Sequence, residues 1–183
     1  MECAAELFAE RGVAGTSLDV VLAAAGAGKS QLYHYFGGRD ELVAAAVGLR
    51  CAQVLAGLTQ ALGSVASLAE LERALSGFVA GFEQMGLPGC PIGSLAAEVA
   101  ERNEGARLQA AAGFDAWERL LTDALERMRD RGELRADAAP AVLATALLAS
   151  IEGGMVLSQA RKDPASLHLA VEAGLARVRT YLG

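Results

Sequence analysis

The chain has 183 residues, of which 53% are hydrophobic, 21% are charged and only 5% are aromatic. That length and composition allow one or two compact units with a buried core, and they exclude an intrinsically disordered chain. The formal net charge is −6, so the bulk charge gives no sign of nucleic-acid binding. Any such binding must depend on a few well-placed contacts.

The distribution of cysteine, histidine and apolar residues excludes further classes. Cys3, Cys51 and Cys90 are far apart and the chain has only two histidines, so we expect no disulfide framework, no metal and no cofactor. No apolar run approaches the roughly 18 residues that span a bilayer, and the N-terminus is acidic, unlike a signal peptide. We therefore expect a cytoplasmic protein with no membrane partner. Because the helical pattern has already begun at Cys3, we also expect the native chain to begin before Met1.

Helical periodicity runs through nearly the whole chain and is interrupted at Gly and Pro. It predicts an all-α protein of about nine helices, in which residues 1–44 form a three-helix head and residues 45–183 a larger bundle. The expected helices are 1–11, a second that Thr16 caps with Asp19 in a capping box, 29–36, about 40–62, one that Ser67 and Glu70 open, about 92–102, about 104–131, and two that start at Asp137–Pro140 and Asp163–Pro164.

Residues 16–42, TSLDVVLAAAGAGKSQLYHYFGGRDEL, predict two short helices joined by a turn that contains glycine. On the second of these helices Leu32 and Phe36 point inward, and Ser30 and His34 point directly away from them. The flanks carry Gln31 and Tyr35 on one side and Lys29 and Tyr33 on the other. A merely solvated face usually carries Lys or Arg, so this set of hydrogen-bonding groups favours entry into the DNA major groove. The aromatic residues could instead belong to the core, and for Phe36 we expect that they do.

This stretch resembles the signature of the TetR family of regulators, A-G-x-x-K-x-x-L-Y-x-Y-F-x-x-[KR]-[DE]-x-L. Here the signature is formed by Ala25, Gly26, Lys29, Leu32, Tyr33, Tyr35, Phe36, Arg39, Asp40 and Leu42. The resemblance implies an N-terminal helix-turn-helix domain and a C-terminal helical domain that binds an effector and dimerises. One departure is Gly28, which stands where family members often have a Ser or Thr that caps the recognition helix.

The resemblance also implies roles for nine residues on a double-stranded DNA operator. Thr16 and Ser17 would hold a phosphate at a helix N-terminus. Tyr33 and Arg39 would contact phosphates, and Lys29 and Tyr35 a phosphate or a base edge. Gln31 is the best candidate for reading a base, since its amide can pair with adenine N6 and N7. Ser30 and His34 are weaker candidates for the same task.

Residues 45–183 would form the effector-binding and dimerisation domain. The piece GCPIGSL (Gly89–Leu95) is similar to a stretch of the LmrA/YxaF-like subgroup, some of whose members respond to flavonoids or drug-like molecules. Apolar residues on converging helices could line a pocket for a small hydrophobic or aromatic effector, although such residues more often form a core. The candidate ligand-binding residues are Phe78, Phe82, Met85, Cys90, Phe114, Trp117, Leu121, Ile151 and Met155, with Gln84, Glu98 and Glu152 as possible polar anchors.

Small and branched residues on the last two helices favour a homodimer through Leu147, Ile151, Val171, Leu175 and Val178. The function expected is that of a transcriptional repressor that a small, mostly apolar molecule releases from its operator. The alternative is a helical adaptor that binds only protein. An enzyme is not expected, because no nucleophile elbow, phosphate-cradling loop or nucleophile–base pair is present.

Overall fold

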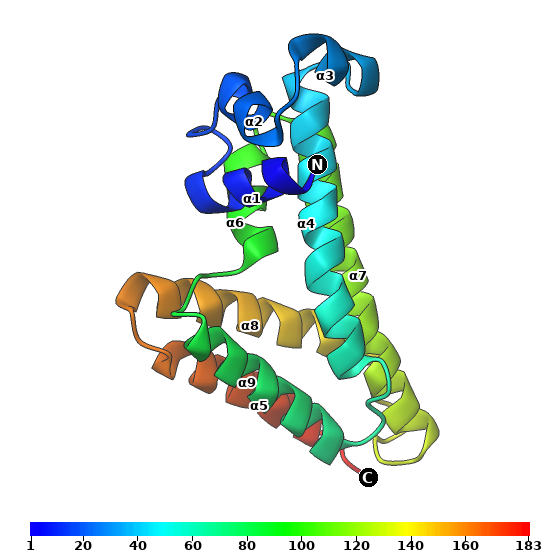
Figure 1. Cartoon of the computed structure of the whole chain (residues 1–183). Coiled ribbons are helices and arrows are strands. Elements are labelled where there is room, and N and C mark those ends of the chain that lie inside the picture. The colour runs from blue at the N-terminus through cyan, green and yellow to red at the C-terminus, as the bar shows by residue number, and fades with distance from the viewer. The chain divides into compact units, whose positions relative to one another are not determined.

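The computed structural model describes residues 1–183 and is built of nine α-helices (Figure 1). The only strand-like feature is an isolated antiparallel bridge between Leu134 and Leu182. The predicted all-α class and helix number are therefore confirmed. The helices are α1 (Glu2–Arg11), α2 (Leu18–Ala25), α3 (Lys29–Tyr35), α4 (Arg39–Leu62), α5 (Leu68–Gln84), α6 (Pro91–Val99), α7 (Glu104–Asp130), α8 (Pro140–Arg161) and α9 (Ala165–Arg179).

Capping side chains explain the predicted start of one helix, whereas the cap predicted for another helix is wrong. Ser67 accepts the Glu70 backbone N–H at 3.3 Å, and the Glu70 carboxylate accepts the Ala66 N–H at 2.8 Å, so this pair opens α5 as predicted. The hydrogen bond from Ala66 holds the pKa of Glu70 below its usual value. Asp137, by contrast, does not cap α8. Its carboxylate pairs with Arg135 at 3.0 Å, and the N-cap position of α8 is held by Ala139.

The chain divides into two compact units. Unit 1 comprises residues 1–55 and 91–114, and unit 2 comprises residues 56–90 and 115–183. Helices α4 and α7 each contribute residues to both units, while α6 belongs to unit 1 with the three N-terminal helices. The functional division into residues 1–44 and 45–183 stays a proposal, and its boundary lies within α4.

Within unit 1, glycine allows α4 and the first part of α7 to approach closely. A Cβ atom on Gly113 would lie 2.8 Å from the Cys51 Sγ, and one on Gly48 would lie 2.7 Å from the Gln109 Oε1. The paired positions increase together along both helices, so α4 and α7 run in the same direction here. Burial raises the pKa of the Cys51 thiol, which is typical of a packed and unreactive cysteine.

Within unit 2, α8 and α9 pack against each other over most of their length. A Cβ on Gly174 would lie 2.5 Å from a Leu147 methyl group, and one on Gly154 would lie 3.0 Å from the Leu167 Cα. This contact buries the five side chains that were expected to join two protomers, so that expectation was wrong. The five residues and their exposures are Leu147 0%, Ile151 0%, Val171 7%, Leu175 4% and Val178 0%.

Two helices, α4 and α8, are long and apolar enough to cross a membrane by length and composition alone, whereas the sequence indicated no apolar run of that length. The most apolar windows are 33% buried in α4 and 44% buried in α8. Core helices of soluble proteins meet the same criterion, so this feature is weak evidence for a membrane. It does show that α8 is apolar on its exposed side as well as on its buried side.

Candidate DNA-binding interface

Helices α2 and α3 are joined by a tight turn whose backbone requires glycine. Gly26 ends α2 in the left-handed conformation, with φ 62°, and its N–H and that of Ala27 donate to carbonyls of the last turn of α2. Gly28 occupies the N-cap position of α3 and supplies no side-chain cap. The backbone N–H groups at the start of α3 are therefore not satisfied by a capping side chain, as the sequence had suggested.

The N-terminus of α2 differs from the sequence prediction. Ser17 is the N-cap, and its hydroxyl accepts the Val20 N–H at 3.3 Å. Thr16 is only 1% exposed, and its hydroxyl donates to the Gly12 carbonyl at 2.8 Å, which ties α2 back to the end of α1. The expected capping box of Thr16 and Asp19 was therefore wrong. Thr16 and Ser17 both fit the pattern of a Ser/Thr N-cap. Only the three-dimensional turn shows that Ser17 is the cap and that Thr16 is its buried neighbour.

Helix α3 has one apolar face and a broad polar face. Leu32 is buried and Phe36 is half-buried, and together with Val21, Leu22 and Leu42 they border an apolar cavity of about 140 Å³. All the remaining side chains of α3 are exposed, with Tyr33 at 60% and Tyr35 at 68%. The exposed residues are Lys29, Ser30, Gln31, Tyr33, His34 and Tyr35.

Two contacts order part of this exposed face. The Lys29 ammonium lies 3.1 Å from the Asp19 carboxylate, and both side chains are at least two-thirds exposed. The rings of His34 and Tyr35 meet edge to face with their centroids 4.9 Å apart. An exposed ion pair contributes only about 0–1 kcal/mol, so a phosphate can replace Asp19 as the partner of Lys29 at little cost.

Arg39, at the start of α4, makes contacts inside unit 1. Its guanidinium donates to the carbonyls of Val13 and Thr16, which fixes the turn between α1 and α2. Only one terminal nitrogen makes these bonds, so the expected phosphate contact stays a prediction, now joined by a structural role. The five N–H donors of a guanidinium allow both roles at once.

Sequence reasoning missed the residues that hold α6 to the head. The Glu98 carboxylate accepts the Ala14 N–H, and its oxygen lies 3.1 Å from where a Cβ on Gly12 would be. The Asn103 amide donates to the Asp40 carbonyl at 2.9 Å, and its oxygen accepts the Ala106 N–H. Glu98 had been considered as an anchor for an effector. Its partner is 84 residues away in sequence, and no local pattern could indicate that pairing.

The residues suggested for the effector lie in different surroundings, most of them in unit 2. Trp117 and Phe78 form a tilted aromatic pair with centroids 5.7 Å apart. Met85 is 69% exposed, and Phe114 is assigned to unit 1. The remaining candidates are each at most 3% exposed: Phe82, Cys90, Trp117, Leu121, Ile151 and Met155. Their role in binding an effector stays a prediction.

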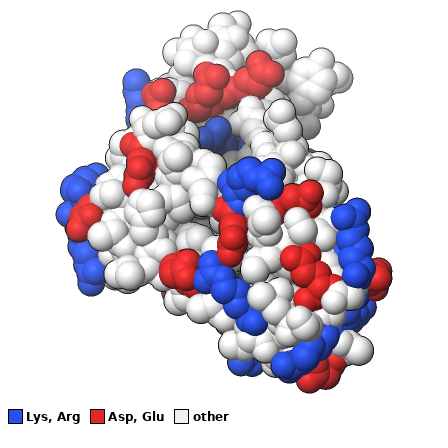
Figure 2. Space-filling view, turned by 90° about the horizontal axis from the view of Figure 1, so that it is seen from below, with Lys and Arg blue, Asp and Glu red and all other residues white.

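The face displayed in Figure 2 carries Lys and Arg side chains interspersed with Asp and Glu, in keeping with the net charge of −6. A three-helix head whose third helix, α3, has a broad polar face, followed by a larger set of helices, defines a helix-turn-helix protein of regulator type. Family models agree over both parts: residues 1–46 match "Bacterial regulatory proteins, tetR family", and residues 67–173 match "Tetracyclin repressor-like, C-terminal domain". The chain belongs to the TetR family of bacterial transcriptional regulators.

Relatives support this assignment along most of the chain. The uncharacterized HTH-type transcriptional regulator Rv0196 of Mycobacterium tuberculosis is 33% identical over 182 residues, covering 91% of this chain and 85% of its own length. The HTH-type transcriptional repressor DhaR of a Mycobacterium species is 26% identical, with 85% and 78% covered. The regulator LmrA of Bacillus subtilis is 28% identical, with 91% and 88% covered, in line with the resemblance at residues 89–95. The crystal structure of a TetR regulatory protein from Rhodobacter sphaeroides aligns with a TM-score of 0.78 and 26% identity, covering 98% and 95% of the two chains. These relatives are transcriptional regulators rather than enzymes.

Proposed function

We propose that the protein is a cytoplasmic repressor that a small, mostly apolar molecule releases from its operator. The observation that carries the DNA-binding part is the exposed hydrogen-bonding face of α3 over its buried Leu32. On the operator, Gln31 reads a base, with Ser30 and His34 beside it. Contacts to phosphate come from Ser17, Lys29, Tyr33, Tyr35 and Arg39, and from the backbone near Thr16.

Repression is the favoured direction of control, since the relative DhaR carries the name of a repressor. The effector would occupy unit 2 near Phe78 and Trp117, whose aromatic pair suits an apolar ligand. The ligand must bind the released state more tightly than the state bound to DNA. It changes the position of α6, and Glu98 and Asn103 transmit that change to the turn after α1 and the start of α4.

A dimer supplies two matched helix-turn-helix heads. The exposed sides of α8 and α9 provide a surface through which two protomers can join. Exposed small and apolar residues recur on α8 at alternating intervals of four and three, and α9 carries a similar stripe with Leu169 at 72% exposure. Small residues let helices of two protomers approach closely. The stripes consist of Val142, Ala146, Ala149, Gly153, Val156 and Ala160 on α8, and of Ala165, Leu169, Ala173 and Ala176 on α9.

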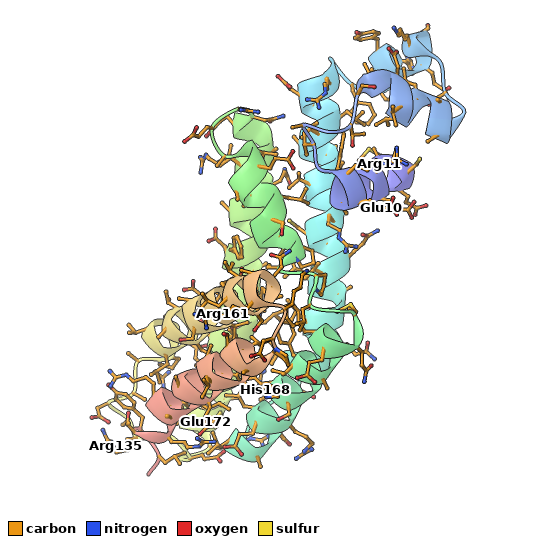
Figure 3. The ribbon with its side chains drawn as sticks, turned by 90° about the vertical axis from the view of Figure 1, so that its left-hand side faces the viewer. Glu10, Arg11, Arg135, Arg161, His168 and Glu172 are labelled. Carbon is orange, nitrogen blue, oxygen red and sulfur yellow. The ribbon has the colours of Figure 1, made fainter.

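Ionisable side chains of α9 beside this stripe find partners within the same protomer. His168 pairs with Glu83 of α5 at 2.6 Å, and Arg179 pairs with Glu72 of α5 and with Glu172 (Figure 3 labels His168 and Glu172). The residues of the stripe itself carry no charge, and these neighbouring side chains are paired within the same protomer. An uncharged surface of small residues favours a second copy of the same chain as its partner.

A gel-shift experiment with the intergenic DNA upstream of the gene tests the proposal. The full-length dimer should retard this DNA at low salt, and Gln31→Ala should weaken the specific complex while leaving binding to unrelated DNA unchanged. The control is Gln53→Ala, an exposed residue of α4 outside the head. Absence of retardation at low salt would favour a helical adaptor that binds only protein.

A further inference from the structure

Glu152 is the one charged residue of α8 before Arg161, which ends the helix. It lies on a face of α8 whose polar residues recur every seven positions, namely Thr145, Glu152 and Gln159. The two residues between them on that face, Leu148 and Met155, are buried. A carboxyl group in such apolar surroundings is costly unless its oxygens find hydrogen-bond donors.

The outer members of this series have partners within unit 2. The Thr145 hydroxyl donates to the Glu118 carboxylate at 2.7 Å, and the Gln159 amide donates to the Pro88 carbonyl at 2.9 Å. The Glu152 carboxyl has one partner, the Cys90 thiol, whereas its Oε1 atom is buried and accepts no hydrogen bond. Glu152 is therefore the member of the series with unused hydrogen-bonding capacity.

We propose that Glu152 Oε1 receives the N–H or O–H group of the effector, which would be an apolar molecule with a single hydrogen-bond donor at one end. This inference rests on the proposed function and narrows its ligand class. A donor on the ligand supplies the partner that the protein lacks, and the apolar body lies against side chains such as Met155, which adapts readily to ligand shape. Burial raises the pKa of the Glu152 carboxyl because desolvation disfavours its ionised form. A hydrogen-bond donor on the ligand would offset part of this desolvation cost.

Three compounds of nearly equal shape provide the binding test: benzylamine, benzyl alcohol and ethylbenzene, titrated into the full-length protein and followed by ligand-observed NMR. The amine and the alcohol should bind roughly tenfold to a hundredfold more tightly than ethylbenzene, as expected for a hydrogen bond to a charged group. The preference should vanish in Glu152→Met. If Glu152→Gln keeps the preference for the alcohol and loses that for the amine, the donor class stands and charge contributes for the cation alone.

A second measurement needs no ligand. Glu152→Met removes a carboxyl that the free protein satisfies only in part, so its melting temperature should rise by about 2–4 °C. The matched control is Gln159→Met, seven residues further on the same face, which loses the bond to Pro88 and should melt lower than the wild type. A fall in the melting temperature of Glu152→Met would assign Glu152 a structural role and overturn the proposal.

Equal affinity for the three compounds, or binding of none of them, would also overturn it. Operator binding by the wild-type protein in the absence of compounds depends on the head and is measured separately. Failure of the wild-type protein to bind DNA would contradict the proposed function, whereas failure to distinguish the compounds contradicts only the inference about Glu152.

Discussion

Helical periodicity in the sequence predicts which side of helix α3 in unit 1 is buried, but it does not predict this for helix α8 in unit 2. In α3 the buried residue and the exposed residues are those that the pattern indicated, because a short helix with one apolar face can be oriented in only one way. Helix α8 has apolar residues all round, so the pattern did not tell which apolar side packs against α9 and which faces outward. Periodicity orients a helix only where its two sides differ in polarity.

We expect the largest effect on operator affinity from a substitution in the exposed stripe of α8. Ala149→Glu places a charge in the middle of this stripe, and we expect it to convert the dimer into monomers without unfolding the protomer. Operator affinity should fall by about 10²–10⁴-fold, because two linked heads gain that much over a single head. Analytical ultracentrifugation and gel shift measure the two quantities. A stable dimer of Ala149→Glu would show that another surface joins the protomers.

A substitution on the buried side of the same helix should lower the stability of the protomer and leave its dimerisation intact. Leu147 is fully buried against Gly174, so Leu147→Ala should lower the free energy of unfolding by about 2–5 kcal/mol through the cavity it leaves. Denaturant unfolding measures this loss. At temperatures where the variant stays folded, its subunits should still associate. Selective loss of the dimer with unchanged protomer stability would restore Leu147 to the interface.

These two helices show how far the sequence leads. Gly and Pro positions and helical periodicity were enough for the number of helices, and the signature from Ala25 to Leu42 was enough for the family and for α3. Contacts that join distant segments could not be predicted. Glu98 finds the Ala14 N–H and Arg39 finds the Val13 carbonyl only after the chain has folded, since neither pair has a sequence pattern. Thr16 illustrates a local limit, because Ser17 beside it has the same capping chemistry.

The exposed face of α3 is tested by Gln31→Ala. Loss of a bidentate contact to a base should weaken operator binding by about 1–3 kcal/mol and relax the preference at one position of each half-site. Competition binding with a set of single-base operator variants measures this change. Equal weakening on all variants would assign Gln31 to the phosphate backbone and leave base reading to Ser30 or His34.

The buried hydroxyl behind this face gives a smaller effect. Thr16→Val keeps the shape of the side chain and removes the bond to the Gly12 carbonyl, so we expect a loss of about 1–2 kcal/mol in the free energy of unfolding. Ser17→Ala should cost about 0.5–2 kcal/mol as a lost N-cap. On the DNA, Ser17→Ala should lower affinity, and Thr16→Val should do so only in proportion to its loss of stability. Thermal unfolding and gel shift of the two variants separate these roles.

The smallest effect concerns the ion pair between Asp19 and Lys29, which connects α2 with the exposed face of α3. Both side chains are largely exposed, so Asp19→Asn should change the free energy of unfolding by less than about 0.5 kcal/mol. The freed ammonium should bind phosphate more readily, which raises operator affinity slightly and makes its dependence on salt steeper by up to about one phosphate contact. Gel shift over a series of salt concentrations measures that slope, with Lys29→Met as the control in which the Asp19 substitution should have no further effect. If Asp19→Asn weakens DNA binding instead, Asp19 orients Lys29 on the operator rather than competing with it.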